Sequence, residues 1–350
     1  MADDHDLQLQ CPVPVKSPRV QLAHGGGGRL MQDLIREIFL RSFDNALLRR
    51  LHDGVTIPVE KGTLAFTTDS YVVSPLIFPG GTIGSLAVHG TINDLAMCGA
   101  MPLYLSAGFI LEEGLSIDTL RDVVETMAKA AEMAEVQIVT GDTKVVDRGK
   151  GDGMFINTAG IGVVPPGIHI GPEEVKPGDC ILLSGDLGSH GLAVMSVREG
   201  LRFAGDIKSD SAPLHRVVAD LIAKGIEIHC LRDLTRGGFA SALNEIVAAA
   251  GMQFLIDERT IPVRDEVQGA CELLGLDPLY VANEGRFVAF VPEAQADHAV
   301  ETMRSHAVAK EAVRVGEVSG RDSSTVVMKT VLGTHRILDL LSGEQLPRIC

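Results

Sequence analysis

Residues 83–100 have the sequence IGSLAVHGTINDLAMCGA, and they stand between the turn-forming Pro79-Gly80-Gly81 and an apolar run at 103–111. The apolar and small residues of the segment recur at helical spacing, which predicts a helix whose inner face is formed by Leu86, Ala87, Thr91, Leu95 and Ala96. The apolar run has the length and composition of a buried strand. A buried helix followed directly by a buried strand predicts mixed helix and sheet.

The same mixture extends over the rest of the N-terminal half. Strands are predicted at 63–73, 137–140 and 154–164, and the second ends in a turn at Gly141-Asp142-Thr143-Lys144. A helix is predicted from Leu30 to Phe39. Another follows Ser116, a residue type that caps helices. Its apolar stripe comprises Ile117, Leu120, Val123, Val124, Met127 and Ala131.

A proline-rich stretch marks the best domain boundary, at Pro165-Pro166-Gly167, Pro172 and Pro177-Gly178. Beyond it, strands are predicted at 180–184, near Phe254, and at 287–291, 313–318 and 325–328. Helices are predicted at 192–198, 212–224, 239–250 and 294–306. We therefore expect an N-terminal arm at 1–20, an N-terminal domain at 21–167, a C-terminal domain at 168–335 and a tail at 336–350.

The composition is that of an acidic enzyme built from small apolar residues. The chain has 350 residues, of which 38 are glycine, 45% are hydrophobic and 4% are aromatic; this suits two domains with glycine-rich loops. A net charge of −15 argues against nucleic acid or an anionic membrane as a partner. Met1 to Asp6 lack the features of a signal peptide, and no apolar run is long enough to span a bilayer. The six cysteines form neither a C-x-x-C pair nor a zinc-ligand pattern, so we expect a cytoplasmic protein with reduced thiols.

Asp69, Asp94 and Asp142 share a context, since each lies near the end of a predicted element, among small residues and close to glycine. Carboxylates placed in this way can converge on Mg²⁺, with phosphate oxygens completing the coordination shell. Asp53 and Asp233 are further candidates. Each aspartate taken singly is also a common cap or turn former, so the residues alone leave a magnesium–nucleotide site and a structural role open.

Three further features could serve such a site. Lys144 could contact phosphates or act as a base, although a solvated lysine gives the same pattern. Glu284, in Asn283-Glu284-Gly285-Arg286, could be a general base or the ion-pair partner of Arg286. The glycine run that contains Gly26 and Gly27 opens a predicted helix and could bind an anion through bare N–H groups, but a flexible linker explains it equally well.

The chain ends on Leu346-Pro347-Arg348-Ile349-Cys350, so its last residue is a thiol. A cysteine on a short terminal segment can move between sites, and a thiolate is a good nucleophile and acyl carrier. Arg348 would favour the thiolate, whereas the adjacent α-carboxylate would oppose it. A frayed end that carries a cysteine by chance is the alternative.

From about His24 to Cys350 the chain resembles the HypE family of hydrogenase-maturation carbamoyl dehydratases, in the superfamily of aminoimidazole ribonucleotide synthetase and selenophosphate synthetase. The motifs that carry the resemblance are His24 to Arg29, Thr68 to Pro75, Gly90 to Gly99, Gly141 to Val146, Asp233 to Gly238, Asn283 to Gly285 and Pro347-Arg348-Ile349-Cys350. The glycine and aspartate elements belong to the whole superfamily. The Pro-Arg-Ile-Cys ending is specific to this family.

The resemblance implies a two-domain α+β fold, with an N-terminal sheet half that dimerises, a C-terminal α/β sandwich and a mobile C-terminal tail. It implies ATP and Mg²⁺ as cofactors. ATP would be held by Asp69, Asn93, Asp94, Asp142, Thr143, Asp233, Gly26 and Gly27, and Mg²⁺ by Asp69, Asp94, Asp142 and Asp53. The family has an acidic pair at residues 52–55, where Gly54 removes one carboxylate, so Asp53 is the weaker candidate of this set.

The implied reaction is the ATP-dependent dehydration of a carbamoyl group on Cys350, from thiocarboxamide to thiocyanate, which supplies cyanide ligands to the iron of [NiFe] hydrogenase. Lys144 and Glu284 would handle the protons. The implied partners are a second copy of the chain, a carbamoyltransferase and iron-carrying scaffold proteins. Two alternatives stay open from the residues. One is a selenophosphate or amidine-forming synthetase with a diffusible substrate, and the other is a non-catalytic carrier or scaffold.

Overall fold

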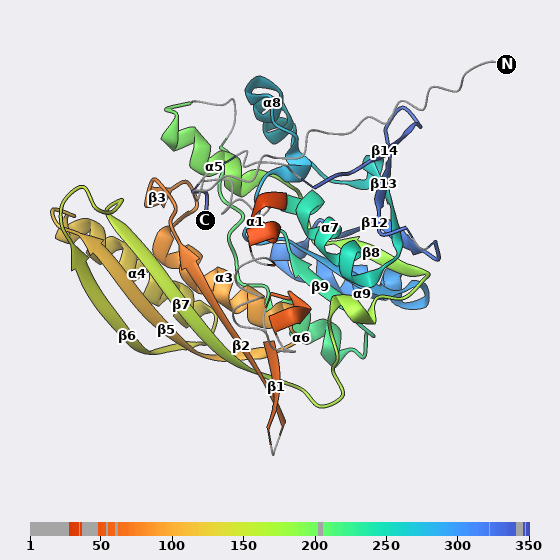
Figure 1. Ribbon diagram of the computed structural model, residues 1–350, viewed down its shortest axis with the longest axis horizontal. Helices are drawn as coiled ribbons and strands as arrows, with labels where there is room; N and C mark the ends of the chain where they lie inside the picture. The colour runs from red at the N-terminus through yellow and green to blue at the C-terminus, as the bar shows by residue number, and fades with distance from the viewer. Residues whose placement is uncertain are drawn as a thin grey trace.

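Two β-sheets with their helices form two domains that lie side by side in the computed structural model (Figure 1). The structure describes residues 28–34, 36, 48–53, 55–59, 62–201, 206–321, 323–340, 346 and 348–350. The predicted arm at 1–20, Gly26, Gly27 and Gly54 lie outside these residues. The predicted α+β class with two domains is confirmed.

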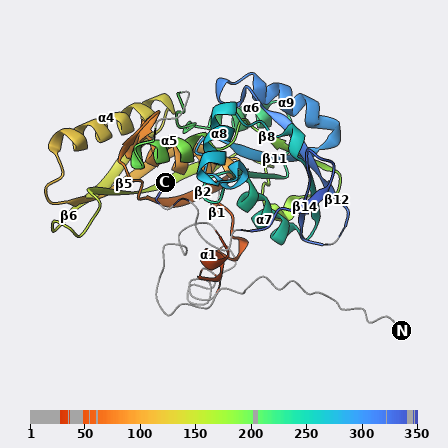
Figure 2. The same ribbon diagram turned by 90° about the horizontal axis from the view of Figure 1, so that it is seen from above.

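The N-terminal sheet has five strands in the order β1-β2-β7-β5-β6. They are β1 Val55–Val59, β2 Gly62–Tyr71, β5 Met101–Glu112, β6 Gln137–Val146 and β7 Met154–Val164. β5 and β6 run parallel, whereas the other pairs of this sheet are antiparallel. Figure 2 shows the long helix α4 (Ile117–Met133) along one face. α3 (Ile83–Met97) covers the same face, since Leu86 of α3, Val123 of α4 and Leu105 of β5 belong to one core. The short strands β3 (Ile77–Phe78) and β4 (Gly81–Thr82) precede α3.

The other face of this sheet is apolar and exposed. Phe66 on β2, Ile161 on β7 and Tyr104 on β5 stand opposite one another in the strand register. Their exposed fractions are 42%, 40% and 47%. Side chains alternate between the faces of a sheet, so Ala65 and Thr67 of the same β2 are buried under α3. A continuous apolar face of this kind is typical of an interaction surface.

The C-terminal sheet has seven strands in the order β14-β13-β10-β12-β8-β11-β9. They are β8 Asp179–Leu183, β9 Cys230–Asp233, β10 Gln253–Asp257, β11 Phe287–Pro292, β12 Val313–Ser319, β13 Val326–Lys329 and β14 His335–Ile337. Both faces are covered. Ile181 and Leu183 of β8 pack into the core beneath α7 (Gly238–Ala250), whereas Leu182 packs toward α6 (His215–Ala223) and α9 (Ala296–Arg304).

Shorter elements complete the description. The other α-helices of the described residues are α1 Arg29–Leu34, α5 Ser189–Arg198 and α8 Asp265–Leu274. Single 3₁₀ turns lie at Leu48–Arg50, Pro172–Glu174, Glu258–Thr260, Pro278–Tyr280, Glu293–Gln295 and Ala307–Ala309. Within the described ranges, no helix combines the length and the apolar character that crossing a bilayer requires.

Most of the predicted elements are present, and the strand predicted at 154–164 coincides with β7. The predicted turn at 141–144 is wrong, because β6 continues through it and Asp142 pairs with Gly108 of β5. The sequence analysis misses β1, β3, β4, β9, α8 and β14, which are short or carry a weak apolar pattern.

Helix α3 connects the cores of both domains. Thr82 caps it, since Thr82 Oγ1 accepts a hydrogen bond from Ser85 N at 3.3 Å and Ser85 Oγ accepts one from Thr82 N at 3.0 Å. Ile92 packs into the core of the N-terminal domain, whereas Met97 packs into that of the C-terminal domain. Asp94, between these two residues, is thereby held at the junction of the domains.

Helix α3 approaches helix α4 closely at Gly84. A Cβ atom at Gly84 would lie 2.3 Å from Val123 O, so we expect Gly84→Ala to lower the free energy of unfolding by about 1–3 kcal/mol. Gly269 in α8 is the matched control, because a Cβ there meets nothing within 4 Å. Gly269→Ala should raise the free energy of unfolding by about 0.5–1 kcal/mol. Denaturant titration measures both; a neutral Gly84→Ala would contradict the packing.

Candidate active site

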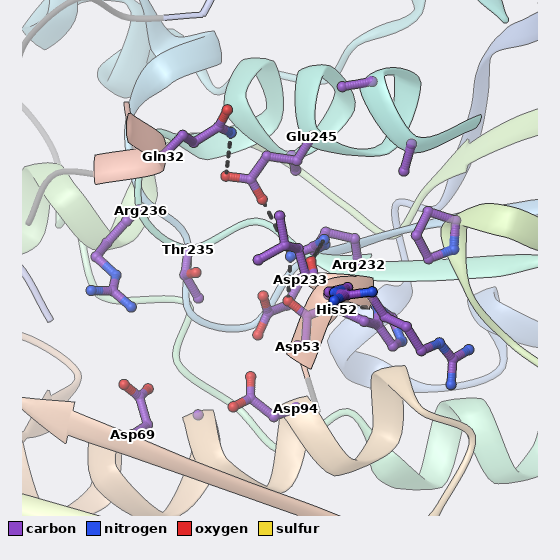
Figure 3. Close-up of a pocket in the computed structure, with 18 of the residues that line it drawn as sticks. Gln32, His52, Asp53, Asp69, Asp94, Arg232, Asp233, Thr235, Arg236 and Glu245 are labelled. Carbon is purple, nitrogen blue, oxygen red and sulfur yellow. Dashed lines mark hydrogen bonds and ion pairs between the residues drawn. The ribbon is translucent and has the colours of Figure 1, made fainter. Parts of the chain in front are cut away.

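A cavity of about 460 Å³ lies between the two domains. β2 contributes Asp69 to its wall, α3 contributes Asp94, and the chain at and after the end of β9 contributes Asp233 and Arg236 (Figure 3). These residues come from both halves of the sequence. With Asp53, which also lines the cavity, the structure therefore brings four of the predicted aspartates together in one place.

Three of the lining carboxylates converge. Those of Asp53, Asp94 and Asp233 each offer an oxygen within 4.8 Å of the others. Thr67, on the buried face of β2, donates from its Oγ1 to Asp94 Oδ2 at 2.8 Å. Arg232 on β9 holds Asp53 through Nη1 and Oδ1 at 2.7 Å. The weaker candidate Asp53 is thus a full member of the cluster, because Arg232 positions it across the domain junction.

The electrostatics of this cluster fit a hard divalent cation. Burial raises the pKa of Asp94 and of Asp233 well above the usual range, and repulsion from neighbouring carboxylates raises both further. Two like charges about 4 Å apart cost about 4 kcal/mol at an effective dielectric constant of about 20. Asp53 Oδ2 has no hydrogen-bond partner among the described residues. A cation with oxygen ligands, such as Mg²⁺, would use that orphaned oxygen and remove the repulsion.

Asp142, Thr143 and Lys144 do not reach this cavity within one chain. They lie on β6 at the edge of the N-terminal sheet, where Lys144 Nζ is 3.6 Å from Asp142 Oδ2 and the two side chains are 75% and 73% exposed. The expectation that Asp142 joins Asp69 and Asp94 around one ion is therefore not met by a single chain. The continuation of β6 through these residues is the cause.

Asn93 has a role that differs from the predicted one. Its Nδ2 donates to Ala212 O at 3.1 Å and to Glu284 O at 3.2 Å, and its Oδ1 accepts from Leu214 N at 2.8 Å. Asn93 therefore ties α3 to two loops of the C-terminal domain. It is absent from the wall of the cavity.

The last residues of the chain form hydrogen bonds with the backbone just after β2. Val72 N donates to Cys350 O at 3.2 Å, and Ser74 N donates to Arg348 O at 3.2 Å. Between them, Ile349 is only 3% exposed. Figure 2 shows the C-terminus at the junction of the two domains. The tail is thus docked, with its terminal residue directed into the molecule.

The docked thiol lies among carboxylates. Burial raises the pKa of Cys350, the charges of Glu284 and Asp69 raise it further, and Arg236 opposes them. Cys350 also packs against the apolar cluster that contains Tyr71. The thiol is therefore protonated in this position at neutral pH. It becomes a better nucleophile only when it leaves or when its surroundings change.

Glu284 is the second buried group beside the thiol. It is 3% exposed, and its Oε1 has no hydrogen-bond partner in the described part of the chain. Burial and then neighbouring carboxylates raise its pKa well above the usual range. Asp210 fixes the loop by accepting from Glu284 N at 3.3 Å and Gly285 N at 3.2 Å. The alternative pairing with Arg286 is wrong, because Arg286 binds Asp186 instead.

Several functional residues are missed by the sequence analysis. Arg236 could have been predicted, because it lies inside the motif Asp233 to Gly238. Its positive charge lowers the pKa of the Cys350 thiol. Arg232 carried a weaker signal, as a charged residue within the apolar β9. The expected support of the thiolate by Arg348 is wrong, because Arg348 forms an ion pair with Asp152.

Tail docking should depend on pH. Because burial raises the pKa of Cys350, docking is fully stable below the pKa of a free thiol, about 8.5, and weakens as the pH rises above it. Protection of the Val72 and Ser74 amides from hydrogen exchange should therefore begin to fall at about pH 8.5 and should fall further up to about pH 10.5. Cys350→Ser has no titrating group in this range and should keep its protection. Equal loss in both proteins would contradict the assignment.

Two family models match the chain. The model for the N-terminal domain of AIR synthase related proteins matches residues 51–164, and the model for the C-terminal domain matches residues 176–329. The two matched ranges correspond to the two sheets described above.

Named relatives are similar over nearly the whole chain. The carbamoyl dehydratase HypE of Azotobacter vinelandii is 53% identical over 338 residues, which cover 97% of this chain and 99% of that protein. A solved structure of HypE in complex with ATP is 50% identical with a TM-score of 0.80, covering 95% of this chain and 100% of that one. A HypE–HypF complex is 47% identical with a TM-score of 0.84, covering 88% and 99%.

Proposed function

The chain belongs to the HypE family of carbamoyl dehydratases, which act in hydrogenase maturation, and we propose that the group it dehydrates is carried on Cys350. The observation that carries the proposal is the position of Cys350, docked where the charges of buried Glu284 and Arg236 act on its thiol. The cavity with its converging carboxylates lies at the same domain junction. The product would supply the cyanide ligands of the hydrogenase iron.

ATP and Mg²⁺ are the proposed cofactors. A HypE structure in complex with ATP supports nucleotide binding. Asp53, Asp94 and Asp233 would hold the cation, because their oxygens converge and repel one another without it. Asp69 and Arg236 line the same cavity, where they could contact the cation and the phosphate oxygens respectively.

In the proposed reaction the oxygen atom of the carboxamide is transferred to the phosphoryl group that ATP supplies. The carbamoyl group forms a thiocarboxamide on the Cys350 sulfur, and ATP supplies a phosphoryl group for the carboxamide oxygen. The C–O bond then breaks, the nitrogen loses two protons, and a thiocyanate, ADP and phosphate remain. Glu284 would take one of these protons, since its raised pKa makes the ionised carboxylate a stronger base. Burial of Ile349 beside the thiol would exclude water from the site.

A homodimer would complete the site. Phe66, Ile161 and Tyr104 form an exposed apolar row on the N-terminal sheet, which a second copy could cover. β6 lies at the edge of that sheet. Association of this kind could bring Asp142, Thr143 and Lys144 of one chain to the cavity of its partner, where Lys144 would help to move protons.

The tail must reach other proteins as well as its own site. We propose that residues 336–350 leave the dock so that a carbamoyltransferase can load Cys350, and again so that an iron-carrying scaffold protein can receive the cyanide. A HypE–HypF complex supports HypF as the carbamoyltransferase partner. We also propose that the two domains extend over residues 21–167 and 168–335 and that the protein acts in the cytoplasm.

Two substitutions separate loading from dehydration. Cys350→Ala removes the nucleophile, so carbamoyl loading should be abolished while ATP binding stays unchanged. Glu284→Gln keeps the thiol, so loading should persist while dehydration slows by about 10²-fold or more. Mass spectrometry of the intact protein, after incubation with the carbamoyltransferase, carbamoyl phosphate and Mg-ATP, follows both steps. Normal loading of Cys350→Ala would disprove the carrier role, and normal water loss by Glu284→Gln would remove Glu284 from the mechanism.

The proposed dimer face can be tested with a charge. Phe66→Glu places a carboxylate in the apolar row, so it should shift the protein to a monomer in light scattering after size-exclusion chromatography. Leu273→Glu is the matched control, because Leu273 on α8 is 82% exposed and lies away from the N-terminal sheet. A dimer that survives Phe66→Glu, or a monomeric parent protein, would contradict this interface.

A further inference from the structure

The main-chain oxygen of each of the last three residues lies at a hydrogen-bond donor. Val72 N donates to Cys350 O and Ser74 N donates to Arg348 O, at 3.2 Å each, and Arg348 O also accepts from Arg198 Nη2 on α5. The chain turns at Arg348, whose φ of 54° lies in the left-handed region, and the carbonyl of Ile349 follows this turn. That carbonyl lies 3.0 Å from His190 Nε2, a side-chain atom on α5.

Packing and hydrogen bonds hold the ring of His190 in one orientation. It is fully buried, and the ring of Phe78 meets it edge to face with centroids 5.5 Å apart. His190 Nδ1 lies 2.8 Å from Ser209 Oγ. Ser209 sits in a loop held by its own N–H, which donates to Pro79 O at 2.8 Å. The loop therefore sets the orientation of the imidazole.

The direction of these hydrogen bonds is also determined. The carbonyl of Ile349 can only accept, so His190 Nε2 carries a hydrogen and donates it to that carbonyl. In a neutral ring Nδ1 then carries no hydrogen and accepts from Ser209 Oγ, which itself accepts from Ser211 N at 3.1 Å. Burial lowers the pKa of His190, which is consistent with a neutral ring. A directed chain of three hydrogen bonds thus runs from a loop of the C-terminal domain to the tail.

We propose that His190 is a positioning residue that recognises the docked tail through the carbonyl of Ile349 and so sets the place of the Cys350 sulfur. His190 does not touch the reacting atoms. It acts one residue away, because fixing the carbonyl and side chain of Ile349 leaves Cys350 little freedom. This inference rests on the proposed function, since it concerns the same thiol, but docking itself can be measured without any chemistry on the sulfur.

The contacts at the tail suggest why a side chain is needed there. The bonds from Val72 and Ser74 involve main-chain atoms alone, so they do not depend on which side chains the tail carries. The His190 bond adds a requirement for one register, because Nε2 is fixed in place and a tail shifted by one residue would move the Ile349 carbonyl away from it. A buried carbonyl without a donor is costly, so the tail docks in one register or leaves.

The test compares three substitutions. His190→Leu keeps most of the volume and removes the donor, whereas His190→Gln retains an amide N–H that can reach the same carbonyl. His298→Gln is the matched control, because His298 is an exposed residue of α9. Thermal unfolding and ATP binding of each variant confirm that it is folded. If His190→Leu fails to fold, Ser209→Ala replaces it, since it removes the group that orients the ring.

The first readout is alkylation of Cys350 at neutral pH, followed by mass spectrometry of the C-terminal peptide. We expect alkylation of His190→Leu to be about five to ten times faster than that of the parent, as for the loss of one buried hydrogen bond. His190→Gln should restore most of the protection, and His298→Gln should match the parent. Equal alkylation of the parent and His190→Leu, or equally fast alkylation of the Leu and Gln variants, would overturn the proposal.

The second readout separates loading from dehydration. Loading occurs outside the dock, so His190→Leu should accept the carbamoyl group as fast as the parent or faster. Loss of water requires the dock, so it should slow by about tenfold, with ATP binding unchanged. Unchanged water loss in His190→Leu would overturn the positioning role. If the parent itself never lost water, the proposed function would fail, whereas the alkylation result would still decide the docking.

Discussion

The removal of several carboxylates from water at one domain junction is the constraint on which the rest of the structure depends. Asp53, Asp94 and Asp233 lie within reach of one ion, and Glu284 is buried nearby. Arg232 and Arg236 offset only part of this charge, because burial and repulsion still raise the carboxyl pKa values. Such an arrangement lowers the stability of the free protein, and a cation with oxygen ligands, as proposed for this site, would remove that cost.

Both domains are built to hold that junction. α3 carries Asp94 between two cores, and Asn93 beside it bonds to the loops that carry Glu284 and Leu214. Asp210 fixes the Glu284 loop from the other side. The tail then closes the site with the end of the chain itself. An acid-rich cavity, a buried carboxyl group at Glu284 and a thiol on a segment that docks by hydrogen bonds fit the proposed elimination, which water would otherwise oppose.

The sequence predicts the parts of this site whose signal is local. Cys350 is evident as a terminal thiol, Asp94 lies in a strong helical pattern, and β7 follows from regular alternation. The errors occur where the structure depends on contacts between residues that lie far apart in the sequence. Residues 141–144 have the composition of a turn, but pairing with β5 keeps them extended. Asp53 is undervalued because its position depends on Arg232, which lies 179 residues away in the chain. His190 shows only a histidine beside glycine, and its role needs the folded tail.

The most direct test follows the oxygen atom of the carbamoyl group. The protein is loaded on Cys350 with a carbamoyl group that carries ¹⁸O, and it is then supplied with unlabelled Mg-ATP in unlabelled water. If ATP activates the carboxamide oxygen, the label should appear in inorganic phosphate, with one ADP formed for each thiocyanate detected on Cys350. Label that remains on the protein, or that appears in water while phosphate stays unlabelled, would contradict ATP-driven dehydration on the terminal cysteine.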